Sequence, residues 1–292
     1  TELRALAKKP EPFFLALGIF KPHSPYKVPK RYWDMYRRED IPAIETPARP
    51  RNAPEIAFHA NHEILGEPSA PRTLHEEAKR EIRHGYYAAM SFADAQFGRV
   101  LDALDELKLR DNTIVVIIGD NGFELGEHDC WGKMTLFGWD ARVPLIISAP
   151  GIGKGGAETN GVSELIDIFP TLTDLSGLPS PPQLEGTSLV PVLKDASASV
   201  KTAALTQHPR PALYWGGGPQ ALPEVMGYGL TTDRWSYHEW RDFKTGHVVG
   251  QELYDEQEDP LETVNLAGTV EAAAQIPALA TQLDRMTKGD QR

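Results

Sequence analysis

The sequence predicts an α/β fold in which a mostly parallel mixed sheet is sandwiched by helices, followed by a small C-terminal antiparallel α+β subdomain. Three features indicate this fold. Residues 12–20 form an apolar run of strand length, residues 76–107 carry apolar side chains at helical spacing, and residues 113–118 are rich in β-branched side chains. A helix between two buried strands is a βαβ unit, which implies parallel strands covered on both faces.

Residues 143–149 (VPLIISA) supply a further strand, which we expect beside 12–20 and 113–119 at the centre of the sheet. Residues 163–177 have the pattern of a helix, and Pro170 should kink or split it because proline lacks the amide that a helix interior needs.

The character of the chain changes after about residue 204. The stretches 234–240 and 251–255 flank a turn-rich segment and predict an antiparallel hairpin, and residues 270–287 predict a moderately amphipathic final helix. We therefore expect two domains, a catalytic α/β portion over 1–204 and a subdomain over 205–292.

Charge and composition limit the classes of molecule that the chain is expected to bind. The 292 residues include 41 acidic and 30 basic side chains, a formal charge of −11, which disfavours nucleic acid and anionic membranes as partners. No apolar run is long enough to span a bilayer. Cys130 is the only cysteine, so an intrachain disulfide is impossible.

The sharpest local feature is the segment 117–122, which reads IIGDNG. Asp120 and Asn121 follow a predicted strand, and ligands of open α/β sheets sit beyond the carboxyl ends of strands. Both side chains offer the oxygen atoms that Ca²⁺ and Mg²⁺ prefer. The same residues also suit an ordinary Asp-Asn-Gly turn with no metal, which is the more common role of such a segment taken alone.

Four blocks, in order and covering nearly the whole chain, resemble the sulfatase family, a branch of the alkaline phosphatase superfamily. They are a strand with Lys-Pro-His-x-Pro, a Gly-Asp-Asn-Gly turn leading to Leu-Gly-Glu-His and a lysine, an Asp-Ile-Phe-Pro-Thr-Leu helix, and a closing Leu-Tyr-Asp-x-x-x-Asp-Pro segment. The blocks fall at 13–26, 117–133, 165–186 and 253–266. The 21–26 block (KPHSPY) and Met226-Gly227-Tyr228 are most similar to iduronate-2-sulfatase and its bacterial relatives.

The resemblance implies roles for individual residues. Asp120 and Asn121 match two ligands of a single divalent cation, normally Ca²⁺, with Mg²⁺ possible. His23 matches a histidine beside the sulfate and leaving-group oxygen, and Lys133 matches a lysine that binds the sulfate. Such groups suit the reaction, because an alkoxide must leave and negative charge develops on the sulfuryl oxygens. We expect His128, by contrast, to be structural.

The sequence departs from the family pattern at the nucleophile. Sulfatases make formylglycine from Cys or Ser in a Cys/Ser-x-Pro/Ala-x-Arg segment, and Cys130 is followed by Trp-Gly-Lys instead. The sequence Ser69-Ala-Pro-Arg places its arginine one residue too early. The family's paired metal-binding Asp residues are also absent, so we expect a segment of the same domain, with the formylglycine, to precede residue 1. The chain alone should be inactive and prone to aggregate through exposed sheet edges.

The resemblance implies hydrolysis of sulfate esters of sulfated sugars such as glycosaminoglycans by the complete protein, in a periplasmic, secreted or lysosomal setting. We expect Arg210 and Trp215, within 208–220, to contact the sugar from the rim of the site with the 234–255 hairpin; an ordinary surface loop is an equal alternative. Two other functions fit the same residues. One is a phosphodiesterase or phosphonate hydrolase of the superfamily, and the other is a non-catalytic remnant that binds an anionic sugar.

Overall fold

The computed structural model describes residues 2–58, 64, 74–212 and 222–288. The chain divides into two compact units, one comprising Thr1–Glu45 with His62–Val115 and the other Thr46–Asn61 with Val116–Arg292. The predicted boundary at residue 204 therefore stays a prediction about domain organisation, although a four-stranded sheet does begin at Ala204. Among the described helices, none is both long enough and apolar enough to cross a membrane.

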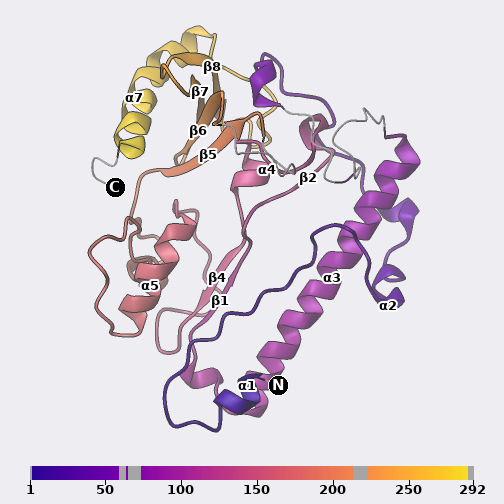
Figure 1. Ribbon diagram of the computed structural model, residues 1–292, viewed down its shortest axis with the longest axis vertical. Helices are drawn as coiled ribbons and strands as arrows, with labels where there is room; N and C mark the ends of the chain where they lie inside the picture. Colours follow the sequence, from indigo (N-terminus) through magenta and orange to yellow (C-terminus); the bar gives the residue numbers. More distant parts are fainter. Residues whose placement is uncertain (1, 59–63, 65–73, 213–221, 289–292) are drawn as a thin grey trace. The chain divides into compact units, whose positions relative to one another are not determined.

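The first unit is built around one long helix, α3 (Glu76–Glu106), which confirms the helix predicted over 76–107. The side chain of His75 caps its first turn by accepting a hydrogen bond from the backbone of Ala78, which satisfies one otherwise unpaired amide. The shorter helical segments of this unit are α1 (Glu2–Leu6), α2 (Lys30–Trp33), η1 (Arg38–Asp40) and η3 (Arg110–Asn112). α2 packs against α3, as Figure 1 shows.

Residues 12–20 are not a strand, so the predicted βαβ unit is not formed. All strands of the described chain except the first residue of β1 lie in the second unit. A strand is defined by hydrogen bonds to a neighbour, and here the apolar run has none. Its side chains are correspondingly open to solvent, with Phe14 82%, Leu17 57% and Phe20 67% exposed.

Two of the predicted strands do pair. β1 (Val115–Ile118) lies beside β4 (Leu145–Ser148), as expected for 113–119 and 143–149. The backbone amide of Gly119 donates to the carbonyl of Pro144 at 3.0 Å, which places the end of β1 beside the start of β4. The pair is therefore antiparallel, a direction that a mixed sheet admits. The short strands β2 (Glu124–Leu125) and β3 (Trp131–Gly132) form a second antiparallel pair, in the loop that connects β1 to β4.

The helix predicted over 163–177 is split, as expected, into η5 (Leu165–Asp167) and α5 (Ile168–Leu175). Pro170 lies in the first turn of α5, where a missing amide costs no helical hydrogen bond. The short helix α6 (Val190–Lys194) packs against α5.

A buried ion network ties this helical segment to the sheet that follows. The ammonium of Lys201 contacts Glu164 at 2.6 Å and Asp167 at 2.7 Å, and Glu164 also accepts the amide of Leu205 at 2.9 Å. Asp167 is fully buried and also accepts the amide of Thr187. Because these carboxylates lie out of water, they depend on Lys201 for charge compensation.

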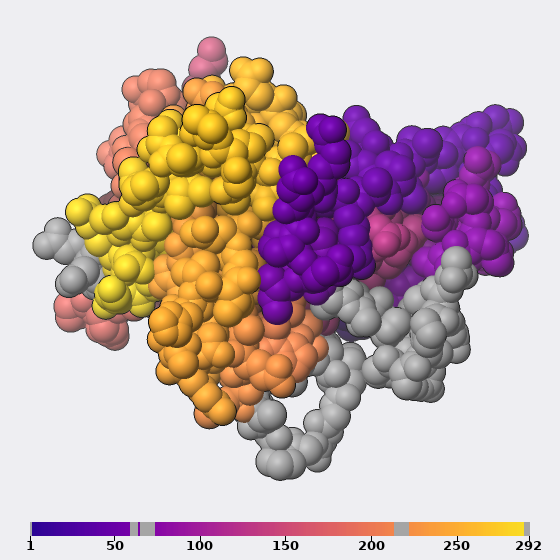
Figure 2. All heavy atoms as spheres, turned by 90° about the horizontal axis from the view of Figure 1, so that it is seen from above, coloured from indigo at the N-terminus to yellow at the C-terminus, as the bar shows by residue number. Residues whose placement is uncertain are grey.

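The C-terminal sheet contains the predicted hairpin and two strands that the sequence reading missed. β7 (Trp235–Asp242) and β8 (Val248–Asp255) are antiparallel, and β5 (Ala204–Arg210) and β6 (Val225–Thr231) extend the sheet in the order β5-β6-β7-β8. The final helix α7 (Val270–Thr287) agrees with the prediction over 270–287 and covers one face of the sheet around Leu230, Tyr237 and Leu253. Figure 2 shows α7 in yellow against the orange strands.

The segment after β8 is fastened to the loop before β4 by a buried acid. Glu262, with φ of 51° and only 2% exposure, accepts a hydrogen bond from the Gly138 amide at 2.8 Å. Gly138 begins the helix α4 (Gly138–Ala141), so the carboxyl group caps this turn from outside. Burial raises the pKa of Glu262 to about 7, although the neighbouring His238 opposes the change.

Replacing Lys201 by Met should destabilise the second unit strongly, because Glu164 and Asp167 would stay buried without a counter-charge. We expect a loss on the order of 3–5 kcal/mol in the free energy of unfolding, measured by urea unfolding of the chain followed by tryptophan fluorescence. The same change at Lys194, an exposed lysine at the end of α6, should cost far less. Equal losses for the two variants would contradict the role of Lys201.

The stability of the chain should fall as pH rises through the range in which Glu262 titrates. Its pKa is about 7 in the folded chain against an ordinary 4.5, so the folded chain binds more protons than the unfolded one between these values. The associated stability is present below pH 4.5 and lost as pH rises through 7. Glu262→Gln keeps an oxygen for the Gly138 amide without the charge. It should reduce the pH-dependent change in the free energy of unfolding by on the order of 3 kcal/mol.

The measurement is the unfolding midpoint at a series of pH values, with Glu258→Gln as the matched control, since Glu258 is exposed in the same segment. The control should keep the slope of the parent chain. An unchanged slope in Glu262→Gln would show that Glu262 is not the titrating group.

Candidate functional site

The candidate metal ligands lie on a tight turn directly after β1. The backbone amide of Asn121 donates to Oδ1 of Asp120 at 3.1 Å, and Nδ2 of Asn121 donates to the carbonyl of Gly122 at 2.7 Å. The amide of Gly122 donates to the carbonyl of Asp140 at 2.8 Å. A Cβ atom on Gly122 would lie 1.9 Å from the carbonyl oxygen of Trp139, so only glycine lets the turn rest against this backbone.

Lys133 lies on a strained loop. His128, Asp129 and Met134 all have positive φ angles, of 53°, 60° and 94°. Non-glycine residues adopt such angles only where surrounding contacts hold them there, and such positions are concentrated at functional sites. The strain on both sides of Lys133 therefore indicates a loop whose shape is imposed by its neighbours.

His128 supplies one of these contacts and is structural, as expected. Its ring is fully buried, and Nε2 lies 2.8 Å from the carbonyl oxygen of Leu261. Because a carbonyl only accepts, Nε2 must carry the proton. Burial lowers the pKa of His128, which keeps the ring neutral. The ring of Phe137 packs edge-on against it, with the ring centroids 4.6 Å apart.

The predicted substrate contact of Arg210 is wrong, because its guanidinium is buried in the core. The side chain is 5% exposed and lies over the Trp240 ring at 4.4 Å. Its nitrogens donate to the backbone carbonyls of Ile56, Ala57 and Met134 at 2.8–3.0 Å. Arg210 ends β5, where the sheet faces the loop of Lys133, and the sequence reading placed it on a surface loop because β5 was not recognised. Trp215 lies outside the described residues.

Buried acids surround the Lys133 loop. Asp140 is 8% exposed, and burial raises its pKa to about 6. Glu124 is more deeply buried, and its pKa is raised well above the ordinary value by burial and by the charge of Asp140. Burial also raises the pKa of the Cys130 thiol, so this cysteine stays protonated at neutral pH and is not a reactive nucleophile. This agrees with the absence of a formylglycine sequence around it.

His23 is held on a loop of the first unit. The ammonium of Lys21 donates to the carbonyl of His23 at 3.0 Å and also to that of Pro25, which closes the loop. Nδ1 of His23 lies 2.8 Å from the carbonyl oxygen of Ser24 and must therefore carry a proton. Tyr26 docks the loop on α3, where a Cβ on Gly85 would come within 3.0 Å of the tyrosine.

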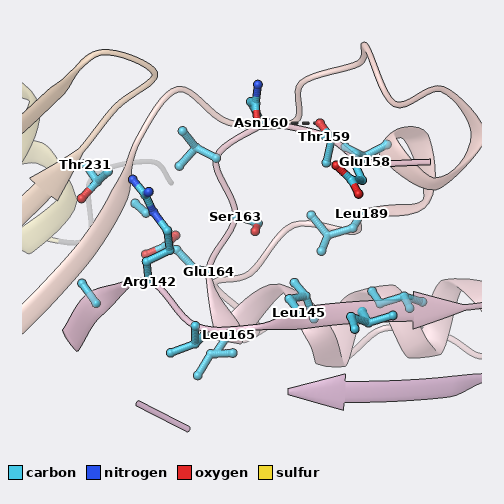
Figure 3. Close-up of a pocket in the computed structure, with 18 of the residues that line it drawn as sticks. Arg142, Leu145, Glu158, Thr159, Asn160, Ser163, Glu164, Leu165, Leu189 and Thr231 are labelled. Atoms are coloured by element: carbon cyan, nitrogen blue, oxygen red, sulfur yellow. Dashed lines mark hydrogen bonds between the residues drawn. The ribbon is translucent and has the colours of Figure 1, made fainter. Parts of the chain in front are cut away.

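Asp120, Asn121 and Lys133 line one pocket of about 1790 Å³, so the structure places three of the predicted site residues along the same hollow. Asp140 and Thr135 line it too. Figure 3 shows another part of its wall, with Leu145 from β4 and the segment that carries Ser163 and Glu164. The pocket exceeds the roughly 300–1,000 Å³ of small-molecule sites. Because His23 belongs to the other unit, its convergence with Asp120 stays a prediction.

The donor set fits a hard cation in kind but is incomplete in number. Asp120 and Asn121 offer a carboxylate and an amide oxygen on an accessible turn, and Ca²⁺ takes six to eight oxygen ligands. Within the described ranges, no three His, Cys, Asp or Glu side chains cluster in a way that could hold a metal. A cation bound here would therefore need further ligands from outside this group.

The sequence reading missed the side chains that hold the site in place. Asp140, Thr135 and Glu262 carry no motif signal of their own, since an isolated acid or threonine is most often a surface or capping group. The only sequence signal is that Thr135 and Asp140 lie close to Lys133 in the chain, and Glu262 does not share it. Their role follows from contacts such as that of Gly138 with Glu262, which lie 124 residues apart in sequence.

The comparisons with known proteins identify the family of the chain. The family model "Sulfatase" matches residues 2–178, and the model "N-sulphoglucosamine sulphohydrolase, C-terminal" matches residues 126–289. Iduronate 2-sulfatase of Mus musculus is 31% identical over 90% of this chain and 59% of its own length. Choline-sulfatase of Rhizobium meliloti is 29% identical over 88% of the chain and 46% of its length. The chain thus spans about half to three-fifths of these relatives.

Solved structures show the same fold. The phosphonate monoester hydrolase of Agrobacterium radiobacter has a TM-score of 0.78 at 26% identity, covering 99% of this chain and 59% of that one. A protein solved in complex with its substrate D-glucosamine-2-N,6-O-disulfate has a TM-score of 0.61 at 28% identity, covering 72% of this chain and 41% of that one. These neighbours confirm the alkaline phosphatase-like fold class. With a family model matching well over half of its residues, the chain belongs to the sulfatase family.

Proposed function

We propose that this chain is the larger part of a sulfuric ester hydrolase that acts on sulfated sugars. The observation that carries the proposal is the shared pocket, in which the Asp120-Asn121 turn and the strained Lys133 loop meet in a chain of the sulfatase family. The substrate class is supported by the similar protein solved with a disulfated glucosamine and by the identity with iduronate 2-sulfatase.

Each residue has a role that its surroundings favour. The ammonium of Lys133 would neutralise charge on the sulfuryl oxygens, where a positioned cation is worth more than in water. His23, whose Nδ1 proton is fixed by Ser24, would give a proton from Nε2 to the leaving alkoxide. Asp120 and Asn121 would supply two oxygens to Ca²⁺, which when bound would polarise the sulfate. The formylglycine nucleophile would come from a segment of the same domain that precedes residue 1.

A phosphonate ester hydrolase is the second candidate, favoured by the TM-score of 0.78 to the Agrobacterium enzyme. Both reactions use a cation and a lysine against an anionic tetrahedral centre, so the fold alone does not separate them. Parallel assays with an aryl sulfate and an aryl phosphonate ester do: the sulfatase proposal requires the larger kcat/KM on the sulfate.

Residues 1–292 alone should show no enzymatic turnover of a chromogenic aryl sulfate, even with added Ca²⁺, because the chain offers no activated nucleophile. Co-expression with the N-terminal segment and the formylglycine-generating enzyme should produce activity. In that complemented protein, Lys133→Ala should lower kcat by about 100-fold, the magnitude typical of removing one transition-state donor. Lys244→Ala, on the exposed hairpin turn, is the matched control. Turnover by the chain alone at an ordinary enzymatic rate would show that the nucleophile does not come from a preceding segment.

The chain alone should bind Ca²⁺ only weakly, since affinity follows the number and charge of ligands. We expect a dissociation constant on the order of 1 mM or weaker by isothermal titration. Asp120→Ala should remove this binding, whereas Asp111→Ala, an exposed acid ahead of β1, should leave it intact. Micromolar affinity, or binding that survives Asp120→Ala, would mean that the site is elsewhere or complete without the preceding segment.

A further inference from the structure

We propose that Arg210 and Asp140 are positioning residues that clamp the turn of Lys133 from opposite sides and so fix its ammonium toward the pocket. The inference deepens the proposed function, on which the catalytic meaning of Lys133 rests. The clamp itself is a statement about backbone contacts in this chain, and it can be tested without any substrate.

On one side, Asp140 holds the amides of the turn. Its Oδ2 accepts the backbone amide of Thr135 at 2.7 Å and the hydroxyl of the same residue at 2.8 Å. The carboxylate also interacts with the backbone amide of Met134. The amide and the hydroxyl of one residue thus bind the same carboxylate oxygen, which fixes the backbone directly after Met134.

On the other side, Arg210 holds the carbonyl of the turn. Its Nη1 donates to the carbonyl oxygen of Met134 at 3.0 Å. The remaining donors anchor the guanidinium on the carbonyls of Ile56 and Ala57, at 3.0 and 2.8 Å, so the arginine cannot follow the loop if the loop moves. The peptide unit that joins Met134 to Thr135 is thus held through its N–H by Asp140 and through its carbonyl by Arg210.

The clamp explains the strained conformation of Met134. A φ of 94° is unfavourable for a side chain other than glycine. Unfavourable backbone angles of this kind cost about 1–3 kcal/mol and persist only where the surroundings over-determine them. Here, buried and charged hydrogen-bond partners on both faces of one peptide unit provide that constraint.

The charges of the clamp are arranged to act on Lys133 as well. Asp140 is buried, which raises its pKa, while the positive charge of Lys133 lowers it. Arg210 is buried without a salt-bridge partner in the described residues, and its charge is met by carbonyl oxygens and the face of Trp240. Lys133 lines the pocket together with Asp140 and Asp120.

The experiment is ¹³C-dimethylation of the lysines of the chain, with NMR detection of the Lys133 resonance, assigned by its absence in Lys133→Arg. In the parent chain we expect a resonance distinct from those of solvated lysines. Arg210→Met and the isosteric Asp140→Asn should each shift it toward the solvated position. Because both act through one turn, the double variant should shift it no further than the larger single change.

Arg241→Met is the matched control. Arg241 is also a largely buried arginine of the same sheet, paired with Glu239 at 2.6 Å and Asp284 at 2.8 Å. Its loss should leave the Lys133 resonance in place, because Arg241 forms no ion pair with the described residues of the turn. Circular dichroism establishes that each variant is folded, and Asp140→Asn decides the question if Arg210→Met does not fold. An unmoved resonance in folded Asp140→Asn, or an equal shift in Arg241→Met, overturns the clamp.

The readout separates this inference from the proposed function. A Lys133 resonance that depends on Asp140 and Arg210 supports the clamp whether or not the complemented protein hydrolyses sulfate esters. In a complemented protein that is active, Asp140→Asn should lower kcat by about 100-fold, as displacement of a catalytic group does. If Asp140→Asn has the kcat of the parent in an active complemented protein, the clamp is again refuted.

Discussion

The candidate site depends on hydrogen bonds that reach the loop between β2 and β4 from segments far away in sequence. The loop contains three non-glycine residues with positive φ angles and cannot hold this shape by local contacts alone. Two bonds from the segment after β8 secure it, one from His128 to the carbonyl of Leu261 and one from the Gly138 amide to Glu262. Without that outside constraint, Lys133 would have no defined direction.

The same constraint explains why the closing segment carries so many polar side chains. Asp259 accepts the amides of Thr263 and Val264, and Asn265 bridges the amides of Leu253 and Ala267 with its oxygen. These bonds hold the backbone at Glu262 in place. The residues that make the segment recognisable as a sulfatase feature are thus occupied with the segment's own geometry, and the resemblance to the family reflects architecture as much as chemistry.

The sequence predicted elements well where periodicity and a local stop signal coincided. The long helix α3, the strands β1 and β4, the hairpin β7–β8 and the final helix all followed from such patterns. The strand predicted over residues 12–20 was wrong, because an apolar run shows that a segment can be buried but not that a partner strand is present. β5 was missed because His208, Pro209 and Arg210 mask its pattern, although the strand pairs with β6 over its whole length.

At the site, the sequence identified the groups that face the pocket but not those that hold them. Asp120, Asn121 and Lys133 carry local motifs, and the structure places them along one hollow. The predicted role of Arg210 in substrate contact was wrong, because an arginine near aromatic residues fits a sugar-binding rim as well as a buried anchor. Only its neighbours decide, and these are the carbonyls of Ile56, Ala57 and Met134, two of them more than 150 residues away in sequence.

These contacts make the C-terminal sheet part of the site, and residues of β5 and β6, such as His208 and Thr231, also line the pocket. Arg210 ends β5, Glu262 follows β8, and both hold backbone groups of the Lys133 loop. The sheet is in turn fastened to the preceding helices by Lys201, buried between Glu164 and Asp167. Each link leaves a charge in the core that is satisfied only in this arrangement. A loosened sheet would therefore cost stability and the direction of Lys133 together, since the same buried groups provide both.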